Sequence, residues 1–233
     1  MLKRLIDIIA SFTGLLVLSP LFCVILFLVW KQDGHSPFYI ADRVGRDGTT
    51  FRMLKIRSMV IRADLAKVES TSANDDRITP VGHFVRRWKL DEFSQLANVL
   101  VGDMSLVGPR PNTVREVASY TPVEQRLLTV KPGITDISSI VFSDEGEILR
   151  GAFDPDRVYS ELIRPWKSRL GLVYIENASC LLDLQLILIT ILAIFNKPQS
   201  LKRITKILES QGADACLIQI VRRETPLRPF PLP

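Results

Sequence analysis

The stretch that organises the chain is Arg86-Arg87-Trp88-Lys89-Leu90-Asp91-Glu92-Phe93-Ser94-Gln95-Leu96-Ala97-Asn98-Val99-Leu100. Cationic residues come first, an adjacent pair of carboxylates follows, and apolar residues recur at steps of three and four. This spacing predicts a helix with one buried face. The chain continues through Val101 to Gly108-Pro109-Arg110-Pro111, which holds an arginine between two prolines. Cations, paired carboxylates and a rigidly framed arginine together indicate a site for an anionic substrate.

Asp91 and Glu92 fall near the first turn of this predicted helix. The positive end of a helix dipole favours an ionised carboxylate, which is the form needed by a nucleophile or a metal ligand. Neighbouring residues are about 100° apart around a helix, so we expect the two carboxylates to have separate roles. Taken by itself, however, such a dipeptide is more often ordinary capping chemistry.

Composition sets limits on the class of protein. The chain has 233 residues, a net charge of +5 and 47% hydrophobic residues. This length suits one domain, or one domain with attachments. The basic excess suits phosphate-bearing partners or an anionic membrane surface. Cys23, Cys180 and Cys216 lack the spacing of a zinc site or a disulfide framework, and we expect a cytosol-facing chain.

An apolar, uncharged run extends over residues 8–30, after the basic residues Lys3 and Arg4. At a helical rise of about 1.5 Å per residue it is long enough to cross a bilayer. Ser19-Pro20 interrupts it, and a proline kinks a helix. Because kinked spans are common, these residues alone favour a span. A sharp kink would instead let the segment enter and leave the membrane by one face.

The region after the apolar run predicts a β-hairpin. Residues 38–40 and 50–55 read as strands, and Asp47-Gly48 between them is a hairpin signal. This region is also rich in arginine and lysine. Its cations either form a solvated face against anionic headgroups, or Lys55 or Arg57 reaches a substrate phosphate.

Three segments near the C-terminal end of the chain have distinct compositions. Residues 180–195 are apolar but short for a span, which favours an interfacial or core helix. Residues 200–210 predict an amphipathic helix that ends at Gly212. Residues 222–233 are rich in proline and are expected to be extended or disordered.

The block from Arg86 to Pro111 resembles the signature of bacterial sugar transferases of the membrane-associated, monotopic phosphoglycosyl transferase family. The stretches Lys55–Met59, Lys131–Thr135 and Asn177–Leu184 agree, and the resemblance covers about residues 1–195. It implies an α+β fold that is mainly helical, with a small cytosolic catalytic domain that includes the short β-hairpin. The implied parts are a re-entrant membrane helix broken at Ser19 and Pro20 (1–31), the catalytic domain with interfacial amphipathic helices (32–196), and a C-terminal helix with a proline-rich tail (197–233).

The resemblance also implies a reaction. Similar proteins transfer a sugar-1-phosphate from a UDP-sugar to polyprenyl (undecaprenyl) phosphate at the cytoplasmic face of the bacterial inner membrane, release UMP, and so begin the assembly of cell-surface glycans. The resemblance implies that Asp91 is the nucleophile that forms an aspartyl phosphosugar and that Glu92 holds Mg²⁺. Lys55, Arg57, Arg86 and Arg110 would bind substrate phosphates. For Arg110, a structural pairing with an acid such as Asp103 is the alternative.

Some residues depart from the family pattern. Lys89 stands where a small hydroxyl residue is usual, Phe93-Ser94 replaces Leu-Pro, and Asp136 stands where glycine is common. These departures bear on the identity of the sugar, and the reaction type is unaffected.

Other functions fit some of the same residues. A membrane-bound diphosphate hydrolase needs the same acids, metal and cations, but lets water attack. A membrane-anchored basic module needs no catalysis at all. Nucleic-acid binding is disfavoured, because the cations do not alternate with a platform of aromatic residues. The sequence leaves open the sugar, the nucleotide base and whether the protein forms a homo-oligomer.

Overall fold

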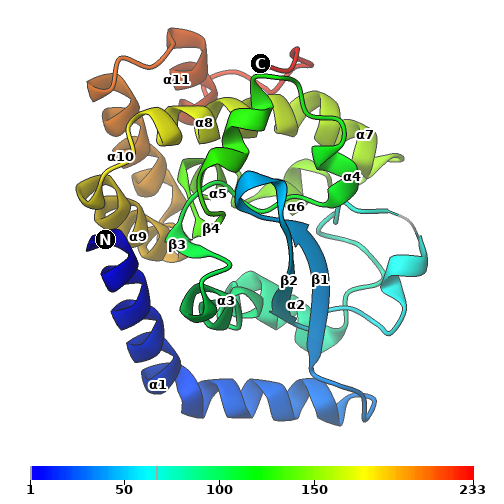
Figure 1. Ribbon diagram of the computed structural model, residues 1–233. Helices are drawn as coiled ribbons and strands as arrows, with labels where there is room; N and C mark the ends of the chain where they lie inside the picture. The colour runs from blue at the N-terminus through cyan, green and yellow to red at the C-terminus, as the bar shows by residue number, and fades with distance from the viewer. Residues whose placement is uncertain (1, 67) are drawn as a thin grey trace.

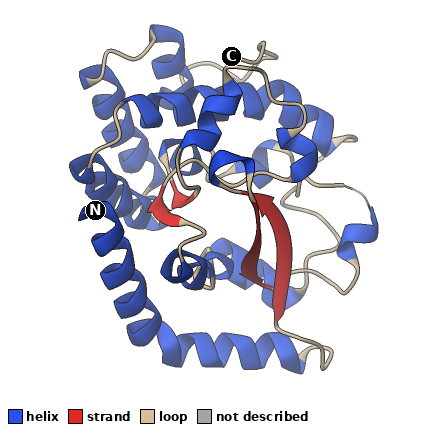
Figure 2. Cartoon of the chain, viewed as in Figure 1, coloured by secondary structure: helices blue, strands red, loops and turns tan. Residues whose placement is uncertain are grey.

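A computed structural model of the chain describes residues 2–66 and 68–233. Helices dominate the fold, and the strands form two small two-stranded sheets (Figures 1 and 2). The mainly helical α+β fold predicted from the sequence is therefore confirmed. In chain order the helices and strands are α1 (Leu2–Lys31), β1 (Phe38–Val44), β2 (Thr50–Ile56), α2 (Pro80–Arg87), α3 (Gln95–Val101), β3 (Ser105–Val107), α4 (Val114–Val117), β4 (Gly133–Thr135), α5 (Ile137–Val141), α6 (Glu145–Ile148), α7 (Pro155–Val158), α8 (Arg164–Glu176), α9 (Cys180–Phe195), α10 (Lys197–Ser210) and α11 (Ala215–Arg222).

Helix α1 changes direction between its two halves (Figure 1). Pro20 lies inside it and has no N–H to donate to the carbonyl of Leu16. The hydroxyl of Ser19 donates to that carbonyl instead, at 2.8 Å. A proline kink with this replacement bond accounts for the change of direction.

Both halves of α1 contact the same globular body. Near the N-terminus, Arg4 donates to the carbonyl of Leu100 at 2.8 Å, and Asp7 accepts from the backbone N–H of Leu106 at 3.0 Å. In the second half, Ile25 and Val29 are buried in one apolar cluster with Ile56, Val85 and Leu90. Both ends of the helix are therefore fixed to the body that contains the hairpin and α3.

The remaining surface of α1 is apolar and exposed, including Phe12, Leu16, Val17 and Val24. Among the described residues, α1 alone is long and apolar enough to cross a membrane. Helix α9 also has a mixed environment: Leu182, Leu186 and Ile189 lie in the core, while its other face is exposed. The apolar run 180–195 is thus a helix half in the core, as the sequence indicated.

The hairpin forms where the Asp-Gly signal predicted it. Strands β1 and β2 pair antiparallel, with Phe38 opposite Ile56 and Val44 opposite Thr50. The second sheet, the parallel pair β3–β4, was not predicted. It depends on a close backbone approach, since a Cβ atom on Gly133 would lie 2.1 Å from the backbone nitrogen of Gly108. This contact fixes the backbone immediately before Arg110.

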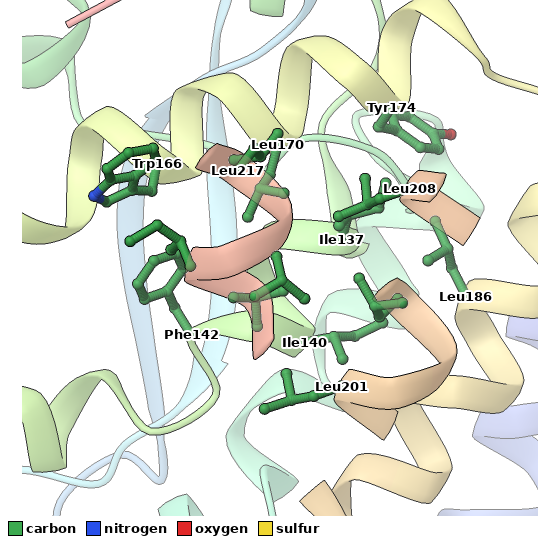
Figure 3. Close-up of a cluster of buried hydrophobic side chains, with 14 of the residues drawn as sticks. Ile137, Ile140, Phe142, Trp166, Leu170, Tyr174, Leu186, Leu201, Leu208 and Leu217 are labelled. Carbon is green, nitrogen blue, oxygen red and sulfur yellow. The ribbon is translucent and has the colours of Figure 1, made fainter. Parts of the chain in front are cut away.

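The largest core cluster joins α5, α8, α9, α10 and α11 (Figure 3). Residues from both sides of the predicted boundary at 196 share it, among them Ile140, Leu170, Leu186, Leu208 and Leu217. Residues 197–233 therefore pack into the same core as helices α5, α8 and α9.

The proline-rich end is extended and lies against α8. Phe230 stacks on Trp166 with ring centroids 4.4 Å apart, and Arg169 donates to the carbonyl of Pro231 at 2.9 Å. The last residues of the chain are thereby attached to the helix that forms the centre of the core.

Candidate active site

A cleft of about 1200 Å³ contains most of the predicted site residues. Its walls come from β2, α2, the segment around Asp91, the loop after β3 and the region between residues 139 and 167. The structure brings together in it Lys55, Arg86, Asp91, Glu92 and Arg110.

Asp91 and Glu92 belong to a 3-10 turn, Leu90–Glu92, that precedes α3. The predicted continuous helix is therefore interrupted. Lys89, just before the turn, has a left-handed backbone with φ 53°. The hydroxyl of Ser94 donates to the carbonyls of Asp91 at 3.1 Å and Leu54 at 3.0 Å. These bonds fix the carboxylate turn against strand β2.

Asn98 makes a second connection between α3 and β2. Its side-chain oxygen accepts from the N–H of Leu54 at 2.9 Å, and its amide donates to the carbonyl of Arg52 at 2.8 Å. Ser94 and Asn98 are one helical turn apart, so they meet the same strand. Their backbone contacts hold Lys55 and the Asp91–Glu92 turn in a fixed relation.

Arg110 pairs with Glu92 and not with Asp103. Its guanidinium donates to Oε1 of Glu92 at 2.5 Å, and Asp103 accepts instead from Asn98 at 3.3 Å. The pairing with Asp103 that was the alternative for Arg110 is therefore not formed, and the acid that Arg110 meets is itself a residue of the cleft.

The four predicted phosphate-binding cations divide into two groups. Lys55, Arg86 and Arg110 line the cleft, and Arg86 donates from Nε to the hydroxyl of Ser58 at 2.9 Å. Arg57 is buried outside the cleft. Its guanidinium donates to both carboxylate oxygens of Asp33, at 2.5 and 2.7 Å, and to the carbonyl of Ser36 at 2.8 Å. The structure therefore does not bring Arg57 to the other site residues.

Burial and charge act together on the acids of the cleft. Burial raises the pKa of Asp91, and the positive charge of Lys55 acts in the opposite direction. Burial alone would also raise the pKa of Glu92, but the charges of Arg110 and Lys89 and the hydrogen bond from Arg110 lower it to about 2. For Glu92 the neighbouring cations outweigh burial and favour the ionised carboxylate, a role that the sequence had assigned to a helix dipole, whereas for Asp91 burial outweighs them.

Lys55 is the cation of the cleft whose pKa moves closest to neutral pH. Burial lowers its pKa to about 8, and the charge of Arg110 acts in the same direction. A buried lysine close to an acid and to other cations is typical of a site that awaits an anion. A bound phosphate would supply the negative charge that Lys55 lacks.

The donor set also suits Mg²⁺. Magnesium is typically held by one or two carboxylates together with substrate phosphates and water. Asp91 and Glu92 are adjacent in the cleft, and in the described part of the chain Arg110 bonds only one oxygen of Glu92. No cluster of three or more acidic, histidine or cysteine ligands occurs among these residues, so a metal here would depend on the phosphates of its substrate.

Sequence reasoning missed the opposite wall of the cleft. Lys167 pairs there with Glu145, and Lys197 pairs with Asp144 at 2.5 Å. Both acids line the cleft. The alternating charges around residue 167 were visible in the sequence, but nothing indicated which acid each cation would meet.

A carboxylate pair surrounded by cations in a cleft is typical of enzyme sites that act on phosphate-bearing substrates. The chain belongs to the bacterial sugar transferase family, whose sequence model matches residues 1–197. The family predicted from the block around Asp91 is confirmed.

Relatives agree with this assignment. The exopolysaccharide production protein ExoY of Sinorhizobium fredii is 33% identical over 208 residues, covering 82% of this chain and 84% of the relative. The galactosyl transferase CpsE of Streptococcus agalactiae is 36% identical over 81% of this chain. A UDP-glucose:undecaprenyl-phosphate glucose-1-phosphate transferase of Klebsiella pneumoniae is also 36% identical, again over 81% of this chain. The matches cover only 41% and 39% of the length of the latter two relatives.

Proposed function

We propose that this protein transfers a sugar-1-phosphate from a UDP-sugar to polyprenyl phosphate at the cytoplasmic face of the bacterial inner membrane. The observation that carries the proposal is the placement of Asp91 in one cleft with Lys55, Arg86 and Arg110, in a chain of the sugar transferase family. Relatives whose names include undecaprenyl-phosphate glucose-1-phosphate and galactose phosphotransferase support the two substrates.

The reaction proceeds in two displacements at one phosphorus atom. A carboxylate oxygen of Asp91 attacks the phosphorus that bears the sugar, and the bond to the bridging oxygen breaks as UMP leaves. An oxygen of the polyprenyl phosphate then attacks the same phosphorus and releases Asp91. Covalent catalysis of this kind divides one difficult transfer into two easier steps.

The cations stabilise the charge that both steps develop. Lys55, Arg86 and Arg110 lie in the walls around Asp91 and are positioned to donate to phosphate oxygens. Glu92 would hold Mg²⁺, which would neutralise part of the charge on the diphosphate. The Glu92–Arg110 pair orients both side chains before the substrate arrives.

The structure also supports a membrane arrangement in which α1 enters and leaves by one face. Its two ends bind the same body through Arg4 and Asp7 at one end and Ile25 and Val29 at the other. A straight span would separate the ends by the thickness of the bilayer. We therefore favour the re-entrant arrangement over the span indicated by the apolar run alone.

The test is product analysis with purified protein, Mg²⁺, polyprenyl phosphate and a panel of UDP-sugars. Transfer predicts that UMP and a lipid-linked sugar diphosphate appear in equal amounts with one preferred sugar. Free sugar phosphate, formed without any lipid product, would contradict transfer and support the hydrolase. Absence of turnover with every donor would support the non-catalytic module.

A further inference from the structure

An exposed aromatic pair lies beside the residues of the cleft. Trp88 follows the end of α2, and its ring centroid is 6.2 Å from that of Phe195 at the end of α9. Both side chains are exposed. Trp88 stands between two residues that line the cleft, Arg87 and Lys89. The aromatic pair therefore marks the edge where the cleft meets the surface.

An apolar surface leads to this pair along α9. Leu181, Leu184, Leu188 and Ile191 are exposed at steps of three and four, and Phe195 continues the series. These residues occupy one face of the helix, opposite the face in the core. Tryptophan at the end of such a surface is typical of a boundary between lipid and water.

Lys89 lies next to the pair and has an unusual backbone. Its φ of 53° is unfavourable for a residue with a side chain. The side chain lines the cleft two residues before Asp91. Nearby acids are already paired: Glu92 with Arg110, Glu145 with Lys167 and Asp144 with Lys197. Within the described ranges, no carboxylate forms an ion pair with Lys89.

We infer that Lys89, Trp88 and Phe195 form the entry site for the lipid-phosphate acceptor. The phosphate monoester binds the Lys89 ammonium, while the polyprenyl chain lies on the aromatic pair and the exposed face of α9. A long apolar chain with an anionic head matches a long apolar surface that ends at a cation. This assignment rests on the proposed function, and it gives the second substrate its own route to Asp91.

The two half-reactions provide the test. UMP released in a single-turnover burst with UDP-sugar alone reports the donor step, and acceptor titration in vesicles reports the lipid step. For Lys89→Met we expect the apparent KM for polyprenyl phosphate to rise about ten-fold, the effect of losing one charge-assisted bond. The burst should fall by a much smaller factor. Trp88→Ala should move the same acceptor KM in the same direction.

Matched variants separate charge from general effects. Lys89→Arg keeps a cation and should restore most of the acceptor KM. Lys206→Met removes an equivalent charge from an exposed site on α10 and should leave both half-reactions as they are.

An unchanged acceptor KM in Lys89→Met, or equal losses in both half-reactions, would overturn the entry site while leaving the transfer reaction standing. Absence of a burst in the unmodified protein would overturn the covalent mechanism, and the entry site with it.

Discussion

Lys55 is the residue through which pH should act most directly on the donor step. Burial holds its pKa at about 8, so the ammonium loses its proton as the pH rises through that value. Its charge is then no longer available to a substrate phosphate. Asp91 should act at the other end of the pH range, because burial raises its pKa and the proposed attack on phosphorus needs the ionised carboxylate.

We therefore predict that kcat/KM for the UDP-sugar falls above about pH 8. In Lys55→Arg the cation stays charged, and the alkaline fall should move to higher pH even if the maximum rate is lower. The pH profile of initial UMP release measures both. A profile with the same alkaline limb in the two proteins would exclude Lys55 as its origin.

Glu92 gives a second prediction at the same scale. Glu92→Gln removes the proposed metal ligand and leaves the Arg110 charge without its partner. We expect kcat to fall about 100-fold, and the Mg²⁺ concentration for half-maximal activity to rise, because about 3 kcal/mol of charge stabilisation is lost. A Mg²⁺ titration of both proteins gives the result. A variant with an unaltered Mg²⁺ requirement would show that Glu92 does not hold the metal.

Single residues also show how far sequence reasoning reached. The adjacent carboxylates and three of the four predicted phosphate-binding cations meet in the cleft. Arg57 lies outside the cleft because it pairs with Asp33. The sequence could not predict this pair, because Asp33 is distant in sequence and any nearby acid would have been an equal candidate. The pairing of Arg110 with Glu92 depends on the β3–β4 contact and could not be read from spacing.

At the scale of elements, the shape of α1 depends on a local sequence motif and on tertiary contacts. Ser19-Pro20 predicts the break, and the hydroxyl of Ser19 replaces the bond that Pro20 cannot make. Both ends of α1 are attached to one body, through residues 96 and 99 positions away at the first end and through Ile56, Val85 and Leu90 at the second. Only the structure reveals these contacts. The hairpin had a clear Asp-Gly turn. Strands β3 and β4 have only three residues each, with 25 residues between them, and such short strands show no detectable periodicity.

The re-entrant arrangement predicts that both ends of α1 lie on the same side of the membrane as Cys216, which is exposed in α11. A Leu2→Cys variant, in which Cys23 and Cys180 are replaced by serine, should react with an impermeant maleimide from the side that labels Cys216. Labelling from opposite sides would establish a span. Adding Pro20→Ala restores a backbone donor in α1 and should reduce the same-side labelling.

At the scale of the whole molecule, one core connects the catalytic region to the C-terminal helices. Leu208 in α10 is fully buried beside residues of α5 and α8 (Figure 3). The amphipathic pattern of residues 200–210 was visible in the sequence, but the surface that covers its apolar face was not. Because Lys197 and Arg223 also hold Asp144, this C-terminal segment supports a wall of the cleft.

We predict that Leu208→Ala destabilises the entire fold by about 2–5 kcal/mol, the usual cost of a cavity in a packed core. Thermal unfolding in detergent should show one transition at a lower temperature than in the unmodified protein. Activity should be lost at the same temperature as the fold. Lys206→Ala, at an exposed neighbouring position, should change the stability by about 0.5 kcal/mol or less. Loss of α10 in a separate early transition would contradict a shared core.

The most direct test of the mechanism is the intact mass of the protein after rapid mixing with Mg²⁺ and its UDP-sugar, without any lipid acceptor. We predict an added mass equal to one phosphosugar, located by peptide mapping on Asp91 and absent from Asp91→Asn. Adding polyprenyl phosphate should return the protein to its original mass. An unmodified mass without acceptor, in a preparation that forms the lipid product once acceptor is added, would contradict the covalent mechanism. An Asp91→Asn variant that still turns over would contradict it as well.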